Sequence, residues 1–135
     1  VNELVKSANE KKVISLNGDG LTSRDFIHYS DICDAINKLI IIDNSKIIYN
    51  IYNLSSGNPL LLIELAELIN KHFKGKINIL INTNEPYLPS SKKDILKPIY
   101  SNERIKNLIK FNPIKVSEGL YKMIKELKWL NEIFF

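Results

Sequence analysis

The sequence predicts a small α/β domain of the α+β kind, in which helices flank a small mixed sheet. Its 135 residues are 44% apolar and 25% charged, which is typical of one globular domain. Segments with a helical spacing of apolar residues alternate irregularly with short β-branched runs. Neither a G-x-G-x-x-G fingerprint nor a P-loop pattern is present, so a complete βαβ nucleotide-binding fold is not predicted.

The first predicted elements are a helix, a strand, a turn and a second strand. Residues 1–10 place apolar side chains at helical spacing, and residues 12–16 (KVISL) are β-prone. Asp19-Gly20 is a turn signal between two such runs. Residues 25–29 (DFIHY) form the second β-prone run.

A longer helix and the strongest strand pattern follow. Ser30 is the predicted N-cap of the helix, because a serine hydroxyl can accept a hydrogen bond from a free backbone amide of the first turn. The predicted apolar stripe of this helix consists of Ile32, Ile36, Leu39 and Ile40. Residues 46–54 (KIIYNIYNL) are rich in β-branched and aromatic side chains and predict a strand.

The next segments predict a helix, a strand and a long loop. Residues 60–73 have an amphipathic helical pattern that ends at Gly75, with an apolar face of Leu61, Leu62, Leu65, Leu68, Ile69 and Phe73. Residues 76–82 predict a strand. Residues 83–98 hold three of the chain's five prolines and predict a loop, and loops of this length are usually functional or mobile.

Two further helices complete the predicted order. Ser101 can cap a helix over residues 102–111, and Ser117 can cap one over residues 118–130. Val116 and Tyr121 have the spacing of a hydrophobic staple around the second cap.

Charge and cysteine content narrow the classes of function. The net charge is +4 with the lysines scattered, which suits an acidic small ligand better than a nucleic acid. Cys33 is the only cysteine, so no internal disulfide can form and a cytoplasmic location is expected. No apolar run approaches the roughly 20 residues of a membrane span. The chain begins with Val1 and its only methionine is Met123, so we expect a piece of a longer protein.

The segment Gly18-Asp19-Gly20 with Arg24 is the main candidate for a binding site. It has two interpretations: a plain turn between strands with an exposed arginine, or a turn at the mouth of a pocket where Arg24 meets an anion. The second is chemically reasonable because a guanidinium group can bind phosphate through two hydrogen bonds at once.

Other candidate residues favour structural roles. Tyr121 and Lys125 match Y-x-x-x-K, but the tyrosine fits a staple better. His28 and His72 are far apart and lack a second ligand at metal spacing, and Cys33 lies near an apolar stripe with no base nearby. No metal site is therefore predicted.

Three blocks of the sequence resemble a known family. Residues 17–36 (NGDGLTSRDFIHYSDICDAI) resemble the G-D-G-x-x-x-R-D-F-I-H-V-x-D segment of the extended short-chain dehydrogenase/reductases. These are the NAD-dependent epimerases and dehydratases of nucleotide sugars, including UDP-glucose 4-epimerase. Residues 52–69 and 91–124 are similar to the two following segments of that family, so the resemblance spans nearly the whole chain.

The resemblance implies that the chain is the C-terminal, substrate-binding half of such an enzyme. An N-terminal Rossmann domain, absent from this chain, would carry the NAD or NADP and the catalytic residues, so the chain alone is expected to be neither catalytic nor cofactor-binding. Its ligand would be a nucleotide-diphosphate sugar. A homodimer is a further expectation, and neither a nucleic acid nor a membrane is expected as a partner.

The resemblance also implies roles for individual residues. Arg24 corresponds to the family arginine that contacts the diphosphate. Ser15 and Asn17 fall where the family lines the base and ribose pocket, and Leu60 falls near the base. A second phosphate contact would involve Lys92, Lys93 and Asp94, because Ser91 stands where the family has an arginine.

An epimerase is the leading functional hypothesis, and four alternatives remain open. A nucleotide-sugar 4-keto reductase or a 4,6-dehydratase fits the same segments. A stand-alone binding or interaction module and a basic nucleic-acid-binding domain are the alternatives outside the enzymes.

Overall fold

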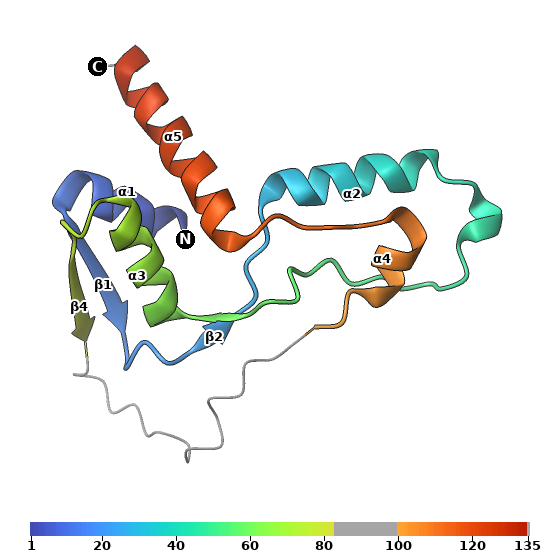
Figure 1. Ribbon diagram of the computed structural model, residues 1–135, viewed down its shortest axis with the longest axis horizontal. Helices are drawn as coiled ribbons and strands as arrows, with labels where there is room; N and C mark the ends of the chain where they lie inside the picture. The colour runs from blue at the N-terminus through green and yellow to red at the C-terminus, as the bar shows by residue number, and fades with distance from the viewer. Residues whose placement is uncertain (83–99, 135) are drawn as a thin grey trace.

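The computed structural model describes residues 1–82 and 100–134 (Figure 1). The elements, in chain order, are α1 (Asn2–Lys11), β1 (Val13–Asn17), β2 (Ser23–Arg24), α2 (Tyr29–Ile41), a 3-10 turn (Asn44–Lys46), β3 (Leu60–Leu61), α3 (Leu62–His72), β4 (Asn78–Asn82), α4 (Glu103–Ile109) and α5 (Val116–Phe134). The loop predicted for residues 83–98 lies outside the described residues.

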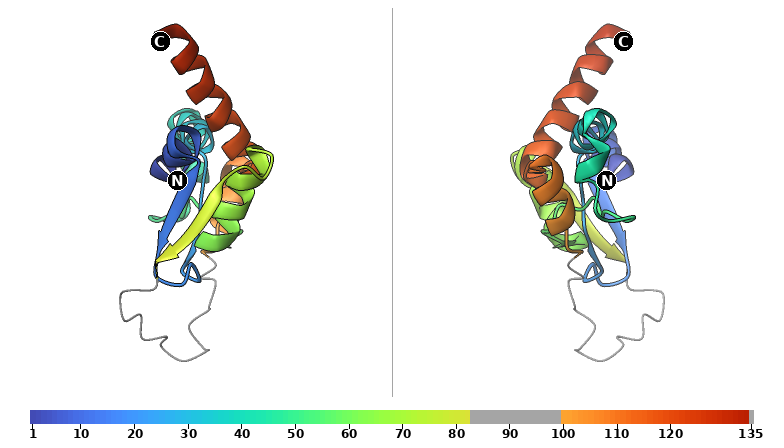
Figure 2. Two further views of the ribbon diagram at one scale, coloured as in Figure 1. Left: turned by 90° about the vertical axis from the view of Figure 1, so that its left-hand side faces the viewer. Right: turned by 90° about the vertical axis from the view of Figure 1, so that its right-hand side faces the viewer.

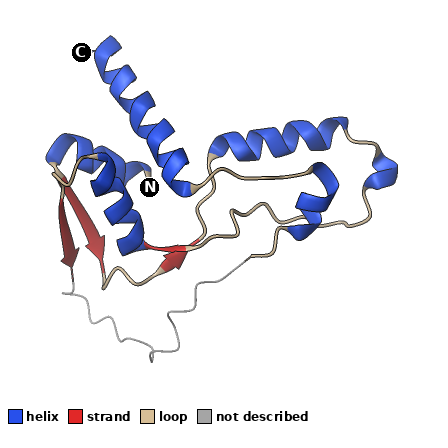
Figure 3. Ribbon diagram, viewed as in Figure 1, coloured by secondary structure: helices blue, strands red, loops and turns tan. Residues whose placement is uncertain are grey.

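The strands form two separate pairs (Figure 3). β1 and β4 pair in parallel, with Ile14 opposite Ile79 and Leu16 opposite Ile81. β2 and β3 pair antiparallel, with Arg24 opposite Leu60. Both strand orientations are therefore present, flanked by helices, and the predicted α/β fold of the mixed kind is confirmed.

The larger hydrophobic core lies against the β1–β4 pair. It joins one face of that pair to α1, α3 and the first turns of α5, as the side views of Figure 2 also indicate. Ile14, Leu65 and Ile69 are fully buried in it. Burying a side chain of this size contributes about 1.5–3 kcal/mol, so this core is the main source of stability around the strands.

A smaller core lies between α2 and α4 and contains Ala35, Ile105, Ile109 and Phe111. The apolar stripe predicted for α2 is wrong in two of its members, because Ile36 is 47% exposed and Ile40 is 74% exposed. The face that α2 turns inward carries Asp31 and Ala35 instead. The apolar periodicity of α2 identified an amphipathic helix but could not identify which face meets α4.

The strand predicted for residues 46–54 is also wrong. The segment follows the 3-10 turn as irregular backbone, and Ile48 and Ile51 are 74% and 69% exposed. A strand requires a neighbour for its backbone hydrogen bonds, and none of the described strands pairs with this segment. The third strand of the predicted order is instead the short β3.

Several predicted helix starts are shifted. α2 begins at Tyr29 with His28 as its N-cap, and the His28 ring accepts a hydrogen bond from the Ser30 backbone amide at 3.3 Å. The strand predicted over residues 25–29 is therefore replaced by extended backbone and the first residue of α2. An imidazole nitrogen can satisfy the same amide as a serine hydroxyl, which sequence rules for caps do not anticipate.

The caps of the last two helices differ in a similar way. α4 has Asn102 as its N-cap, although the hydroxyl of Ser101 does accept a weak hydrogen bond from the Glu103 amide at 3.4 Å. α5 begins at Val116, so Ser117 lies inside the helix and cannot be its cap. The staple predicted for Val116 and Tyr121 is accordingly wrong.

The turn after β1 is confirmed and is closely packed. Gly18 and Gly20 have φ angles of 76° and 74°, which favour glycine, and the Asp19 carboxylate accepts a hydrogen bond from the Leu21 amide at 2.8 Å. A Cβ added to Gly20 would lie only 3.2 Å from the Cβ of Ile63. The turn thus connects β1 to β2 while lying against the start of α3.

Gly119 of α5 gives a test of packing between α5 and the N-cap of α2. A Cβ at this position would lie 3.1 Å from Cδ2 of His28, whose Nδ1 is held 2.7 Å from the Ser30 hydroxyl. We expect Gly119→Ala to destabilise the protein by about 1–3 kcal/mol in denaturant unfolding. Helix propensity alone predicts the opposite sign, a gain of about 1 kcal/mol.

Two control variants identify the cause of the Gly119 effect. Lys125→Ala, at an exposed position of the same helix, is expected to change stability by no more than about 0.5 kcal/mol. In a His28→Ala background the contact is absent, so Gly119→Ala should be neutral or stabilising. A loss of stability that persists in that background would contradict the proposed contact.

Within the described residues, no helix is both long and apolar enough to span a membrane.

Candidate functional site

Arg24 lies at the edge of a polar cavity. β2 presents its side chain to solvent, and Nη1 donates a hydrogen bond to the carbonyl oxygen of Ser23 at 2.9 Å. The cavity has a volume of about 460 Å³ and is lined by Arg24, Asp25, Ile27, Tyr52, Asn53, Leu54, Ser55 and Tyr100. No carboxylate among the described residues forms an ion pair with Arg24, so its guanidinium group can bind an anion.

The neighbouring Asp25 has a different role in the same wall. Its Oδ1 accepts a hydrogen bond from the Ser56 amide at 2.7 Å, and its Oδ2 accepts one from the Gly57 amide at 3.0 Å. A carboxylate that accepts two backbone amides is already satisfied, and such charge-assisted bonds are stronger than neutral ones. Gly57 has a φ of 72°, which lets the chain turn at this point.

Hydrogen bonds between residues far apart in the sequence form the other wall of the Arg24 cavity. The Ser55 hydroxyl donates to the carbonyl oxygen of Tyr100 at 2.7 Å. The buried Asn102 donates from Nδ2 to the Ser55 carbonyl oxygen at 2.8 Å, and Asn53 donates to the Ser101 carbonyl oxygen at 3.2 Å. The segment after residue 52 is therefore joined to the start of α4 by side-chain hydrogen bonds.

The composition of the cavity suits an anionic ligand with ring-shaped parts. Arg24 supplies a positive charge and a planar set of donors, which matches phosphate geometry. Tyr52 and Tyr100 supply aromatic rings and hydroxyls, and Asn53 supplies an amide. These groups can bind a ligand through charge, aromatic contact and hydrogen bonds.

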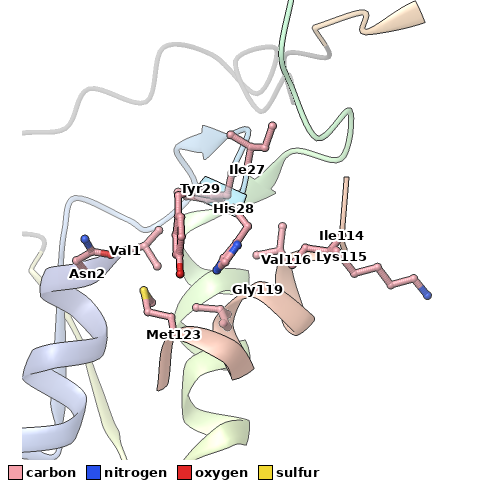
Figure 4. Close-up of a pocket in the computed structure, with 12 residues that line it drawn as sticks. Val1, Asn2, Ile27, His28, Tyr29, Ile114, Lys115, Val116, Gly119 and Met123 are labelled. Atoms are coloured by element: carbon pink, nitrogen blue, oxygen red, sulfur yellow. The ribbon is translucent and has the colours of Figure 1, made fainter. Parts of the chain in front are cut away.

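A second, smaller cavity of about 230 Å³ lies between the start of α2 and the start of α5 (Figure 4). The rings of His28 and Tyr29 lie 4.4 Å apart along it, and Met123 and Val1 adjoin them. Nε2 of His28 is buried without a hydrogen-bond partner among the described residues. The Tyr29 hydroxyl donates to Glu126 at 3.1 Å, and this carboxylate raises the pKa of Tyr29 above its ordinary value.

The structure brings together two of the predicted site residues. Arg24 and Leu60 are directly opposite each other in the β2–β3 pair. Ser15 and Asn17 lie on the other strand pair, on its exposed face, where they are paired with Leu80 and Asn82. Neither residue lines the Arg24 cavity.

The predicted second phosphate contact, at Lys92, Lys93 and Asp94, lies outside the described residues.

Sequence reasoning missed several residues of the cavity. Asp25, Ser55 and Asn102 form its hydrogen-bonded frame, and Tyr52 and Tyr100 supply its rings. The Ser55-Ser56-Gly57 run carried a usable signal, because small polar residues followed by glycine favour a turn whose amides need an acceptor. The pairing of this turn with Asp25 spans 31 positions and cannot be seen in the local sequence.

The structure also places the other candidate residues outside the Arg24 cavity. Nε2 of His72 lies 3.2 Å from the carbonyl oxygen of Ser117. The ring centroids of His72 and Tyr121 are 6.2 Å apart. Cys33 is exposed on α2, so the core position predicted for it near the apolar stripe is wrong. In the parts of the chain that the structure describes, no three His, Cys, Asp or Glu residues gather as metal ligands.

Comparison with known proteins identifies the type of domain. The family model described as "NAD dependent epimerase/dehydratase family" matches residues 1–55. A curated relative, the uncharacterized protein MJ1055 of Methanocaldococcus jannaschii, is 29% identical over 110 residues, which is 81% of this chain and 31% of the relative. The chain therefore spans about a third of that protein's length.

Solved structures contain the same fold within longer chains. A UDP-glucose 4-epimerase of Thermotoga maritima, solved with UDP-glucose, is 18% identical with a TM-score of 0.73, over 95% of this chain and 38% of that one. A UDP-glucuronic acid 4-epimerase of Bacillus cereus, solved with UDP-glucuronic acid and NAD, is 21% identical with a TM-score of 0.69, over 92% and 38%.

The fold is thus that of a domain found within nucleotide-sugar epimerases. Residues 1–55 of the chain are similar to the NAD-dependent epimerase/dehydratase family.

Proposed function

We propose that residues 1–135 are the nucleotide-sugar-binding C-terminal domain of a longer NAD- or NADP-dependent enzyme, an epimerase in the first instance. The observation that carries this proposal is the position of Arg24, which follows a tight glycine turn and faces a polar cavity without an acidic partner among the described residues. Two similar structures hold UDP-glucose or UDP-glucuronic acid, which supports a nucleotide-diphosphate sugar as the ligand.

In this proposal the chain binds and orients the substrate. Arg24 contacts the diphosphate, and Leu60 lies beside it near the base. Ser15 and Asn17 line the base and ribose pocket from the exposed face of β1. Holding the sugar in one orientation against a nicotinamide ring contributes to catalysis without any chemical step in this chain.

The cofactor is assigned to another part of the protein. A dinucleotide pyrophosphate is usually held by a glycine fingerprint at a helix N-terminus, and this sequence lacks that fingerprint. We therefore assign no residue of the chain to NAD or NADP. When bound, the nicotinamide would supply hydride transfer.

An N-terminal Rossmann domain is the proposed partner, and the exposed isoleucines of α2 and of the segment after it indicate where it packs. This isoleucine set consists of Ile36, Ile40, Ile41, Ile47, Ile48 and Ile51. Residues 46–54 have the near-continuous apolar pattern of a strand buried on both faces, which is typical of parallel sheets in α/β proteins. We propose that this segment becomes a strand in the sheet of the partner domain.

A 4-keto reductase or a 4,6-dehydratase is the second candidate. Structures of the same fold include a dTDP-glucose 4,6-dehydratase and a GDP-mannoheptose C4 reductase. The residues that separate these reactions are assigned here to the partner domain, so this chain is compatible with each of them.

A kinetic comparison tests whether this chain binds the substrate while the partner domain supplies the cofactor and the catalytic residues. The purified 135-residue chain is expected to show no turnover of UDP-glucose with NAD, because neither a cofactor fingerprint nor a credible catalytic pair is present. The longer protein, assayed in parallel by NADH absorbance and sugar analysis, is expected to bind UDP-glucose and convert a sugar of this class. Turnover by the 135-residue chain alone would contradict the proposal.

A further inference from the structure

Asp25 offers a role beyond the predicted phosphate contact. It follows Arg24 directly, yet the two side chains serve different purposes: Arg24 is exposed, while the Asp25 carboxylate accepts the amides of Ser56 and Gly57 at 2.7 and 3.0 Å. These two bonds join the end of β2 to a turn 31 and 32 positions further along the chain.

The same turn is held from its other side by the segment before α4. Ser55 is 4% exposed, and its hydroxyl and carbonyl oxygen bond to Tyr100 and Asn102. Asn102 is 5% exposed, so its amide has little water to replace that bond. The turn therefore connects Asp25 to Ser55 and Tyr100, which line the Arg24 cavity.

We propose that Asp25 is a positioning residue for nucleotide-sugar binding, acting by fixing the Ser55 and Tyr100 wall of the cavity relative to Arg24. This inference rests on the proposed function. Loss of the carboxylate would leave two adjacent amides without their acceptor, and an asparagine in its place would direct an N–H group at one of them. The turn would then shift, and with it the cavity wall beside Arg24.

Asp31 provides a matched control for this experiment. Asp31 is a buried carboxylate and Asp25 is a half-buried one, and Asp31 likewise accepts a backbone amide, that of Ile114 at 3.2 Å. Asp31 also lies close to β2 in the sequence. Asp31 does not line the Arg24 cavity. Asp25→Asn and Asp31→Asn therefore make the same chemical change at a cavity position and at a distant one.

The experiment measures UDP and NAD binding to the full-length protein by calorimetry, at a temperature where circular dichroism shows all variants to be folded. Asp25→Asn is expected to weaken UDP binding at least tenfold with NAD affinity unchanged within twofold. Asp31→Asn is expected to leave both affinities within twofold. Backbone hydrogen exchange at Ser56 and Gly57 should accelerate at least tenfold only in Asp25→Asn.

The outcomes separate this inference from the function on which it rests. If the wild-type protein binds UDP and Asp25→Asn binds it with the same affinity, the positioning role is overturned. The proposed function then still stands. Equal losses of UDP affinity in both variants would also overturn the positioning role, because the effect would then be a general one of stability. A wild-type protein that does not bind UDP would overturn the proposed function and this inference with it.

Discussion

Replacing Arg24 with alanine is expected to weaken binding of UDP-glucose by about 2–5 kcal/mol in the longer protein, roughly 30-fold to several-thousandfold. The reason is that a diphosphate would lose a charge-assisted, two-pronged contact and remain partly desolvated in the cavity. NAD affinity should stay within twofold, because the cofactor is assigned to another domain. Calorimetric titration of each ligand into the purified variant measures both quantities.

Two further arginine variants sharpen this test. Arg24→Lys keeps the charge without the planar fork, so its loss should be smaller than that of Arg24→Ala. Arg104→Ala is the matched control, since Arg104 is also exposed but stacks on Tyr49 at 4.2 Å and does not line the cavity. Equal losses for UDP-glucose and NAD, or a loss as large in Arg104→Ala, would place Arg24 outside the nucleotide-sugar site.

Features set by short-range preferences could be predicted from the sequence. The strands at β1 and β4 and the helix α3 follow from the alternation and spacing of their apolar residues, which depend only on neighbours within a few positions. The turn at Gly18 and Gly20 follows from the positive φ angles that glycine adopts freely. Arg24 is a candidate because it follows that turn, and its phosphate-binding role is implied by the resemblance of residues 17–36 to the family segment.

Features that depend on a distant partner could not be predicted from the sequence alone. Residues 46–54 have the composition of a strand, but a strand forms only where another strand accepts its hydrogen bonds. The apolar stripe of α2 suggested a buried Ile40, whereas the helix turns Ala35 toward α4. Asp25 looked like an ordinary polar residue because its two bonding partners lie more than 30 positions away.

The last prediction concerns the isoleucine set. It compares one substitution in the isolated 135-residue chain and in the longer protein. Ile48 is 74% exposed in this chain, so Ile48→Asp is expected to change the stability of the isolated 135-residue chain by no more than about 0.5 kcal/mol. In the longer protein the same substitution would place an unpaired carboxylate in the proposed interdomain sheet. The expected loss there is about 3–5 kcal/mol, the usual cost of an uncompensated buried charge.

Thermal and denaturant unfolding of both proteins measures the change in the free energy of unfolding. Two further variants serve as controls. Ile48→Ala removes apolar area without adding charge, so its loss in the longer protein should be smaller than that of Ile48→Asp. Asn112→Asp adds a charge at an exposed position outside the isoleucine set and should have little effect in either protein. If Ile48→Asp is equally mild in both settings, Ile48 remains in water in the longer protein. The partner domain would then pack on a different surface, and residues 46–54 would not be a strand of its sheet.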